Sequence, residues 1–100
     1  SAVTRSHCED RMACAVALGS PKEFQLWLSH YVKVLAGVGN EAHLRLLVEM
    51  LLSEEASSNS SSAWWLSSAP TVLNLNRKEL VKTVVIPEMS KNRGLQRLTN

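Results

Sequence analysis

The segment from Ser20 to Leu35 constrains the fold most, because it combines a helix start with a wide apolar stripe. Ser20 can accept a hydrogen bond from a first-turn amide, and Pro21 suits the first helical position. Glu23 can reach back to the amide of Ser20, which completes a capping box. We therefore expect a helix that begins at Pro21. Its apolar side chains fall within roughly 160° of a helical wheel, which is typical of a packing surface. They are Phe24, Trp27, Leu28, Tyr31, Val32, Val34, Leu35 and Val38.

The polar side of the same helix carries one apolar residue. Leu26 lies there among Lys22, Ser29, His30 and Lys33, on the opposite side from the stripe. A single surface leucine is common in folded proteins and needs no functional explanation. It can also contact a partner helix, so Leu26 is a candidate partner-binding residue.

A helix is predicted to precede this one, from Arg5 or Ser6 to Leu18, with Gly19 as its stop. It carries the two cysteines, Cys8 and Cys14, whose six-residue separation turns them about 120° apart on a helix. They cannot easily pair with each other. We interpret both as small buried side chains in a reducing compartment.

A third helix is predicted from Glu41 to about Ser53, with Asn40 as its cap. Its apolar residues cover about 240° of the wheel, more than one antiparallel neighbour can cover. The helix is therefore either central in the fold or presents its surplus face to another chain. Two residues of this helix, Leu46 and Met50, are candidate partner-binding residues. The apolar set is Leu44, Leu46, Leu47, Val48, Met50, Leu51 and Leu52.

The composition changes after the third helix. Residues 53–69 begin with acidic residues and continue as a serine tract that is too polar to pack, so we predict a long flexible loop. Trp64 and Trp65 follow the tract, and adjacent indoles left in water would be unfavourable. They either fold back onto the core, which we favour, or dock on a partner. Both are candidate partner-binding residues.

The last part of the chain gives weaker signals. Residues 70–75 are expected to be extended, and the pair Asn76 and Glu79 predicts another capped helix. The run from Thr83 to Ile86 is β-branched, so a strand is an alternative there. Pro87 predicts a kink or a restart. Together the patterns predict an all-α fold, a small bundle of four to five helices within one domain over residues 1–100. Because the chain starts with Ser, we expect a fragment of a larger protein.

No chemical motif is evident. The three histidines, His7, His30 and His43, are scattered without a nucleophile motif, and their spacing to the cysteines matches no usual metal site. The Gly37–Gly39 pair lacks the third glycine of a phosphate-binding loop. We therefore predict no catalytic, cofactor-binding or metal-binding residues, no cofactor, and no enzyme activity. Glu49 interrupts the richest apolar run, so no membrane span is expected.

The C-terminal third is basic and supports an alternative, a helical nucleic-acid-binding domain. The formal net charge of the whole chain is only +2, and no aromatic residues interleave with the basic ones. Direct nucleic-acid binding is therefore the weaker interpretation. The candidate basic surface comprises Arg77, Lys78, Lys82, Lys91, Arg93 and Arg97.

Four sequence blocks in order resemble the C-terminal domain of the HIRA histone chaperone family: 17–32, 44–52, 75–81 and 92–98. The first reads Ala-Leu-Gly-Ser-Pro-Lys-Glu-Phe-x-x-Trp-Leu-x-x-Tyr-Val. The second reads Leu-Arg-Leu-Leu-Val-Glu-Met-Leu-Leu, the third Leu-Asn-Arg-Lys-Glu-Leu-Val and the fourth Asn-Arg-Gly-Leu-Gln-Arg-Leu. The chain departs from the family pattern between Leu52 and Pro70, where a serine tract and two tryptophans replace Gly-Pro and one tryptophan.

The resemblance implies a nuclear, non-enzymatic scaffold module. Members of the family belong to a complex that deposits histones independently of DNA replication and so acts in nucleosome assembly, chromatin organisation and transcription regulation. For the C-terminal region of these proteins, the resemblance implies self-association and attachment of a large tetratricopeptide-type subunit related to calcineurin-binding protein. These partners are expectations from the resemblance alone.

Overall fold

The computed structural model describes residues 3–53 and 64–91, and this part of the chain is mostly helical and contains no strand. Three long helices come first: α1 (Arg5–Leu18), α2 (Pro21–Gly37) and α3 (Glu41–Leu52). Short elements follow: the 3₁₀ helix η1 (Trp64–Ser67), α4 (Ala69–Val72), α5 (Arg77–Leu80), the π-helical turn η2 (Val81–Val85) and α6 (Ile86–Ser90). The all-α prediction is confirmed.

The predicted helix starts are confirmed, because a side-chain oxygen caps each one. Ser20 accepts a hydrogen bond from the amide of Glu23 at 3.3 Å, and Asn76 accepts one from Glu79 at 2.9 Å. Thr4 and Asn40 cap α1 and α3 in the same way. Gly19 ends α1 with a φ of 69°, a left-handed conformation that favours glycine, and so allows α2 to turn back beside α1.

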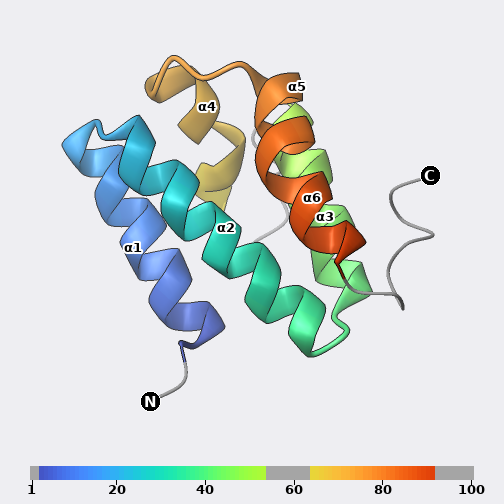
Figure 1. Ribbon diagram of the computed structural model, residues 1–100. Coiled ribbons are helices and arrows are strands. Elements are labelled where there is room, and N and C mark those ends of the chain that lie inside the picture. The colour runs from blue at the N-terminus through green and yellow to red at the C-terminus, as the bar shows by residue number, and fades with distance from the viewer. Residues whose placement is uncertain (1–2, 54–63, 92–100) are drawn as a thin grey trace.

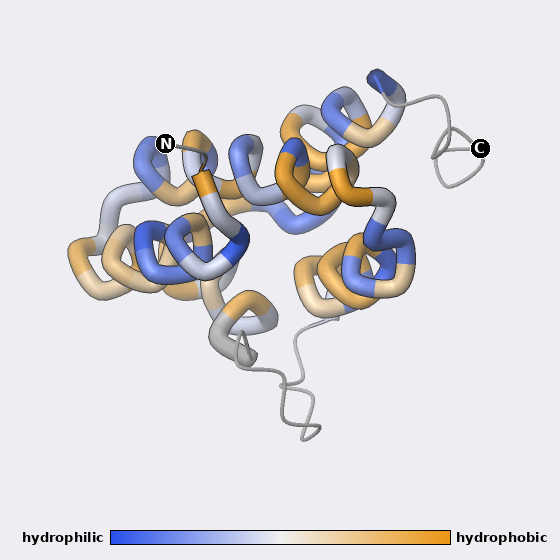
Figure 2. The backbone as a smooth tube through the Cα atoms, turned by 90° about the horizontal axis from the view of Figure 1, so that it is seen from below, coloured by the Kyte–Doolittle hydropathy of each residue, from blue (hydrophilic) through white to orange (hydrophobic). Residues whose placement is uncertain are grey.

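The helices surround one core. In Figure 1, α1 and α2 lie side by side and antiparallel, while α5, η2 and α6 follow one another as a single rod in front of α3. Helix α2 contacts α1, α3, η2 and α6. Figure 2 shows hydrophobic and hydrophilic residues alternating along the coils, as expected of helices that bury one side.

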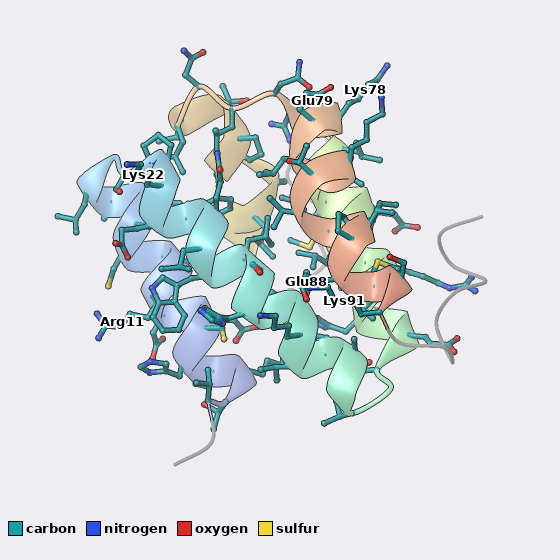
Figure 3. The ribbon with its side chains drawn as sticks, in the orientation of Figure 1. Arg11, Lys22, Lys78, Glu79, Glu88 and Lys91 are labelled. Atoms are coloured by element: carbon teal, nitrogen blue, oxygen red, sulfur yellow. The ribbon has the colours of Figure 1, made fainter. Side chains whose placement is uncertain are left out.

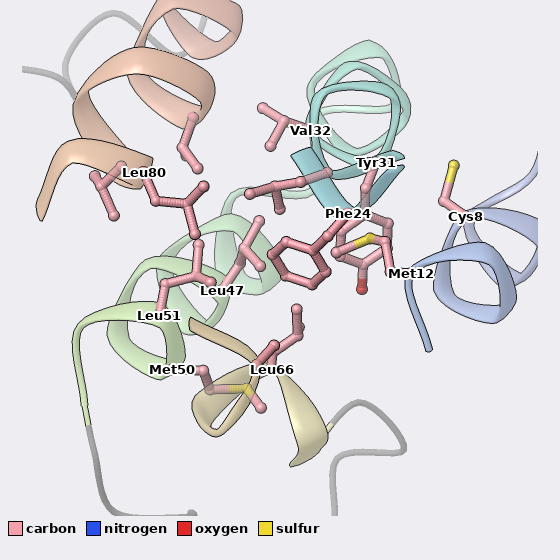
Figure 4. Close-up of a cluster of buried hydrophobic side chains, with 14 of the residues drawn as sticks. Cys8, Met12, Phe24, Tyr31, Val32, Leu47, Met50, Leu51, Leu66 and Leu80 are labelled. Atoms are coloured by element: carbon pink, nitrogen blue, oxygen red, sulfur yellow. The ribbon is translucent and has the colours of Figure 1, made fainter. Parts of the chain in front are cut away.

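The apolar stripe of α2 forms the centre of this core (Figure 4). Phe24, Leu28, Tyr31 and Val32 are fully buried. The stripe is narrower than the sequence predicted, because Trp27 and Val34 are half-buried and Val38 is 75% exposed at the end of the helix.

Helix α3 is central, which answers the question raised by its wide apolar surface. It contacts α2 on one side and η1, η2 and α5 on the others. The chain after residue 63 therefore covers most of the surplus face. Met50 is only 4% exposed and lies near Leu66 of η1 in Figure 4, whereas Leu52 stays 47% exposed.

Two expectations for residues 53–75 need correction. Residues 54–63 of the predicted loop lie outside the described residues, but its last part is helical, since η1 and the start of α4 occupy it. Residues 70–75 are not extended. Pro70 is tolerated in the first turn of α4, and Asn74, at a φ of 56°, reverses the chain so that the Leu75 amide reaches the Pro70 carbonyl at 2.7 Å.

The β-branched run before Pro87 is helical, so the alternative of a strand is wrong. A proline inside an α-helix clashes with the carbonyl four residues earlier, here that of Thr83. The helix widens here into the π-helical turn η2, in which the Ile86 amide donates a hydrogen bond to the Val81 carbonyl five residues earlier. Helix α6 then restarts at Ile86, as the proline predicted.

The two cysteines have different surroundings. Cys8 is fully buried with Met12 and Ala15, whereas Cys14 is exposed, so the prediction that both are buried is wrong for Cys14. Burial raises the pKa of the Cys8 thiol, and the nearby Glu9 carboxylate raises it further. Only a thiolate reacts readily, so burial and a raised pKa both protect Cys8, whereas Cys14 is open to reagents.

A thiol-labelling experiment should therefore separate them. At pH 8, Ellman's reagent is expected to modify Cys14 within the folded chain and Cys8 only after unfolding in denaturant. A Cys14→Ser variant should lose the fast phase alone. Two equally fast thiols in the native chain would contradict the packing of α1.

Candidate functional site

A row of four exposed residues and one half-buried residue, His30, runs along the outer side of α2. Lys22, Leu26, His30, Lys33 and Gly37 follow one another at steps of four, four, three and four positions, the spacing that places side chains on one side of a helix. Leu26 is 50% exposed, so it is a surface residue as the sequence indicated. We call these five residues the α2 outer row.

A cluster of rings and a cation lies beside this row, at the seam between α1 and α2. Trp27 is half-buried, and its ring centroid lies 5.3 Å from that of His7 and 5.1 Å from that of His30. The Arg11 guanidinium sits 5.8 Å above the same indole, within cation–π range. Sequence reasoning assigned Trp27 to the core stripe. The signal it missed is that Trp27 stands at the edge of that stripe.

A shallow groove of about 230 Å³ lies between the end of α2 and α6. Lys33, Ala36, Gly37, Glu88 and Lys91 line it. The carboxylate of Glu88 accepts hydrogen bonds from Lys91 at 3.1 Å and from Ser29 at 3.4 Å. Figure 3 shows Glu88 and Lys91 beside α2. The groove therefore lies between α6 and the end of the α2 outer row, which contributes Lys33 and Gly37 to its lining.

The other predicted partner-binding residues do not join Leu26 on this face. Met50 belongs to the core, and Leu46 is half-buried and packs against it. Trp64 and Trp65 form the start of η1, and their side chains lie outside the described part of the structure. A partner role for these four residues stays a prediction.

Arg77 does not belong to an open basic surface, because its guanidinium is used inside the chain. One nitrogen donates to the carbonyls of Leu51 at 2.8 Å and Ser53 at 2.9 Å. The other donates to the Ser67 carbonyl at 2.7 Å and to Thr71 Oγ1 at 2.9 Å. Arg77 therefore links the end of α3 to η1 and α4. The carbonyl groups at the end of a helix have no partner within the helix, and the guanidinium takes the place of water there.

The remaining basic candidates are spread over the molecule. Lys78 and Lys82 are exposed on α5 and η2, and Lys91 pairs with Glu88. In Figure 3, Lys78 points away from the top of α5, far from the labelled Lys91. Arg93 and Arg97 lie outside the described residues.

A polar cluster that the sequence did not predict joins the three long helices. The Tyr31 hydroxyl donates to Glu9 Oε2 at 2.7 Å and lies 2.6 Å from His43 Nε2. Arg5 donates to the same Glu9 oxygen at 3.4 Å. Burial raises the pKa of Tyr31 well above its usual value, and the hydrogen bond to Glu9 adds to this. The hydroxyl therefore stays protonated and links α1 to α3.

The pKa of His43 in this cluster is lowered. Burial disfavours the charged ring most, Arg5 adds repulsion, and Glu9 partly opposes both effects. In the unfolded chain, a histidine takes up its proton near pH 6.5, whereas folded His43 resists protonation until a lower pH. The stability linked to His43 is therefore complete above about pH 6.5 and is lost as the pH falls below that value.

Chemical denaturation at several pH values tests this. The free energy of unfolding of the native chain is expected to fall between about pH 7 and pH 5. A His43→Gln variant, whose amide can still donate to Tyr31, should show a shallower fall over the same range. Equal slopes for the two chains would contradict the role of His43.

Within residues 3–53 and 64–91, no group of three or more histidine, cysteine or acidic side chains is placed to hold a metal ion. The helices of this part are also too short or too polar to cross a membrane. The buried polar groups described above bond to one another and to backbone groups, which suits a structural role.

Comparison with known proteins decides the family. The family model Hira, described as TUP1-like enhancer of split, matches residues 1–51, which span α1, α2 and most of α3. The chain belongs to the Hira family. The resemblance that the sequence blocks indicated is thereby confirmed.

Curated relatives extend the similarity to the rest of this Hira-family chain. Protein HIRA of Oryza sativa subsp. japonica is 34% identical over 105 residues, which cover 97% of this chain and 10% of the rice protein. Protein HIR1 of Gibberella zeae is 39% identical over 105 residues and 99% of the chain, again 10% of the relative. Protein HIRA of Takifugu rubripes is 33% identical over 96 residues, covering 96% of the chain and 9% of the fish protein. The chain thus spans about a tenth of these relatives. No solved structure matches it.

Proposed function

We propose that this Hira-family chain is a non-enzymatic protein-interaction module. It acts as a scaffold in the nucleus and supports the assembly of a HIRA-type histone chaperone complex for replication-independent nucleosome assembly. Its chief partner is the tetratricopeptide-type subunit related to calcineurin-binding protein, and self-association is a second mode of assembly. Family membership and similarity to HIRA proteins over nearly the whole chain support this proposal.

The observation that carries the proposal is the α2 outer row beside Trp27. One side of α2 forms the core, the other presents the half-exposed Leu26 to solvent, and the half-buried Trp27 stands at the edge of the core stripe. Large apolar and aromatic side chains of this kind are the usual anchors of protein interfaces. His43 and Arg77, by contrast, hold helices together, because their side chains form hydrogen bonds within the chain.

The alternative of a nucleic-acid-binding domain loses much of its basis. Of the six basic candidates, Arg77 makes four hydrogen bonds within the chain and Lys91 pairs with Glu88. Within residues 3–53 and 64–91, the other two basic candidates are Lys78 and Lys82, and two lysines do not form the continuous positive stripe that tracks a phosphate backbone.

Light scattering coupled to size exclusion tests the proposal. The chain is measured alone, then mixed with the tetratricopeptide-type subunit, and a new peak with the summed mass is expected. The variants Trp64→Ala and Trp65→Ala then ask whether the tryptophan pair contributes. Absence of the complex would contradict the proposal. A complex with a DNA duplex that dissociates steeply with added salt would favour the alternative instead.

A further inference from the structure

We propose that the outer face of α2 binds an acidic amphipathic helix of a partner protein. This inference rests on the proposed function and specifies the surface and the chemistry of the partner. The α2 outer row gives a straight track for such a helix, because its five residues lie on one side of the 17-residue α2. A helix laid in an apolar groove is a common mode of peptide recognition, and its contacts recur every three to four residues.

Apolar contacts are available at two places on the track. Near its middle, Leu26 is 50% exposed and Trp27 is half-buried beside it. At its end, the groove of about 230 Å³ opens over Ala36 and Gly37. A Cβ added at Gly37 would meet nothing within 4 Å, so the backbone there is open to close approach. A partner side chain can therefore enter the groove while others rest on Leu26.

The charges around the track favour an acidic partner. Lys22 and Lys33 lie on the row, and neither forms an ion pair within the described part of the chain. Arg11 of α1 lies beside the track, and Figure 3 shows Arg11 and Lys22 in one view onto α2. Lys91, which follows α6, borders the groove and is paired with Glu88. Acidic side chains on a docked helix would meet these cations at its margins, which steers association and fixes orientation.

The acidic residues on the same face are few. Glu23 is exposed in the first turn of α2. The side chain of Glu88 is only 11% exposed and is bonded to Lys91 and Ser29, so its charge is largely satisfied. These two carboxylates and the central Leu26 make the face unsuitable for a phosphate backbone. A helix with an apolar stripe and acidic margins fits both features.

Fluorescence anisotropy with designed peptides tests the inference on the full 100-residue chain. The probe is a labelled amphipathic helix of about 18 residues, matched to α2 in length, with a leucine stripe and glutamate margins. Its partner probe carries lysine in place of every glutamate. The glutamate probe should bind, and the lysine probe should bind at least about tenfold more weakly.

Charge reversal gives the decisive arm. The double variant Lys22→Glu/Lys33→Glu should weaken the glutamate probe by about tenfold or more and gain affinity for the lysine probe. Leu26→Ala should weaken the glutamate probe by roughly three- to tenfold. Gly37→Leu, which fills the groove, should weaken it as well.

Matched controls lie on other faces of the molecule. Lys78→Glu/Lys82→Glu makes the same change in net charge on α5 and η2, and Leu52→Ala removes an apolar side chain of similar exposure, 47%. Both should bind the glutamate probe like the native chain, and circular dichroism verifies that every variant is folded.

Three results would overturn the inference: equal binding of the two probes, no binding of either, or equal weakening by the control pair. Displacement of the probe by a DNA duplex would assign the face to nucleic acid and would also overturn it. The tetratricopeptide-type subunit takes no part in this experiment. If the peptides fail to bind while light scattering still detects the complex with that subunit, the inference about the α2 surface is wrong and the proposed function stands.

Discussion

Replacing Arg77 with alanine is expected to lower the free energy of unfolding by about 3 kcal/mol. The four hydrogen bonds of its guanidinium reach the end of α3, Ser53, η1 and Thr71 of α4, all at 2.7 to 2.9 Å. Alanine leaves three backbone carbonyls without this charged donor, and water replaces it only in part. Urea denaturation followed by circular dichroism at 222 nm measures the loss.

Two controls separate geometry from charge at this position. Arg77→Lys retains the charge, but its single ammonium cannot span four acceptors, so it should recover less than half of the lost stability. Lys78→Ala, the exposed neighbour on α5, should change stability by less than about 0.5 kcal/mol. If Arg77→Ala and Lys78→Ala were equally mild, the joint between α3 and α4 would not depend on Arg77.

Replacing Phe24 with alanine should cost about 3 to 5 kcal/mol, the usual range for a fully buried phenylalanine. Phe24 is 0% exposed and lies at the middle of the core in Figure 4, near Leu47, Met12 and Leu66 from three other elements. The cavity left by alanine loses these contacts at once. A domain of this size has little stability to spare, so thermal unfolding should shift by well over 10 °C.

Leu26 supplies the matched control for this substitution on the same helix. Leu26→Ala removes a side chain that is 50% exposed, so stability should change by less than about 0.5 kcal/mol. This difference matters for function, because a variant that stays folded can report binding alone. Similar losses of stability from Phe24→Ala and Leu26→Ala would contradict the description of α2 as a helix with one buried side and one exposed side.

Local sequence signals predict the helices in the first half of the fold. The caps at Ser20 and Asn40 and the stop at Gly19 act through neighbouring residues, so the sequence alone places the starts of α2 and α3 correctly. The family is likewise visible from the sequence blocks, because they are made of core and capping residues.

The rest depends on residues far apart in the chain. Arg77 bonds to Leu51, which is 26 positions away, and Tyr31 joins Glu9 to His43 across three helices. No spacing rule indicates such contacts, so the sequence pattern places Arg77 on a basic surface and does not predict the Tyr31 cluster. The sequence predicts an extended segment over residues 70–75 because a four-residue helix offers too few positions for periodicity.

The proposed interaction module presents the outer side of α2, and hydrogen–deuterium exchange of the chain, alone and mixed with the tetratricopeptide-type subunit, tests this proposal. Exchange is expected to slow in peptides that cover residues 22–37 when the subunit is present, with α3 unchanged. Identical exchange in the two samples, or protection confined to α5 and η2, would contradict it.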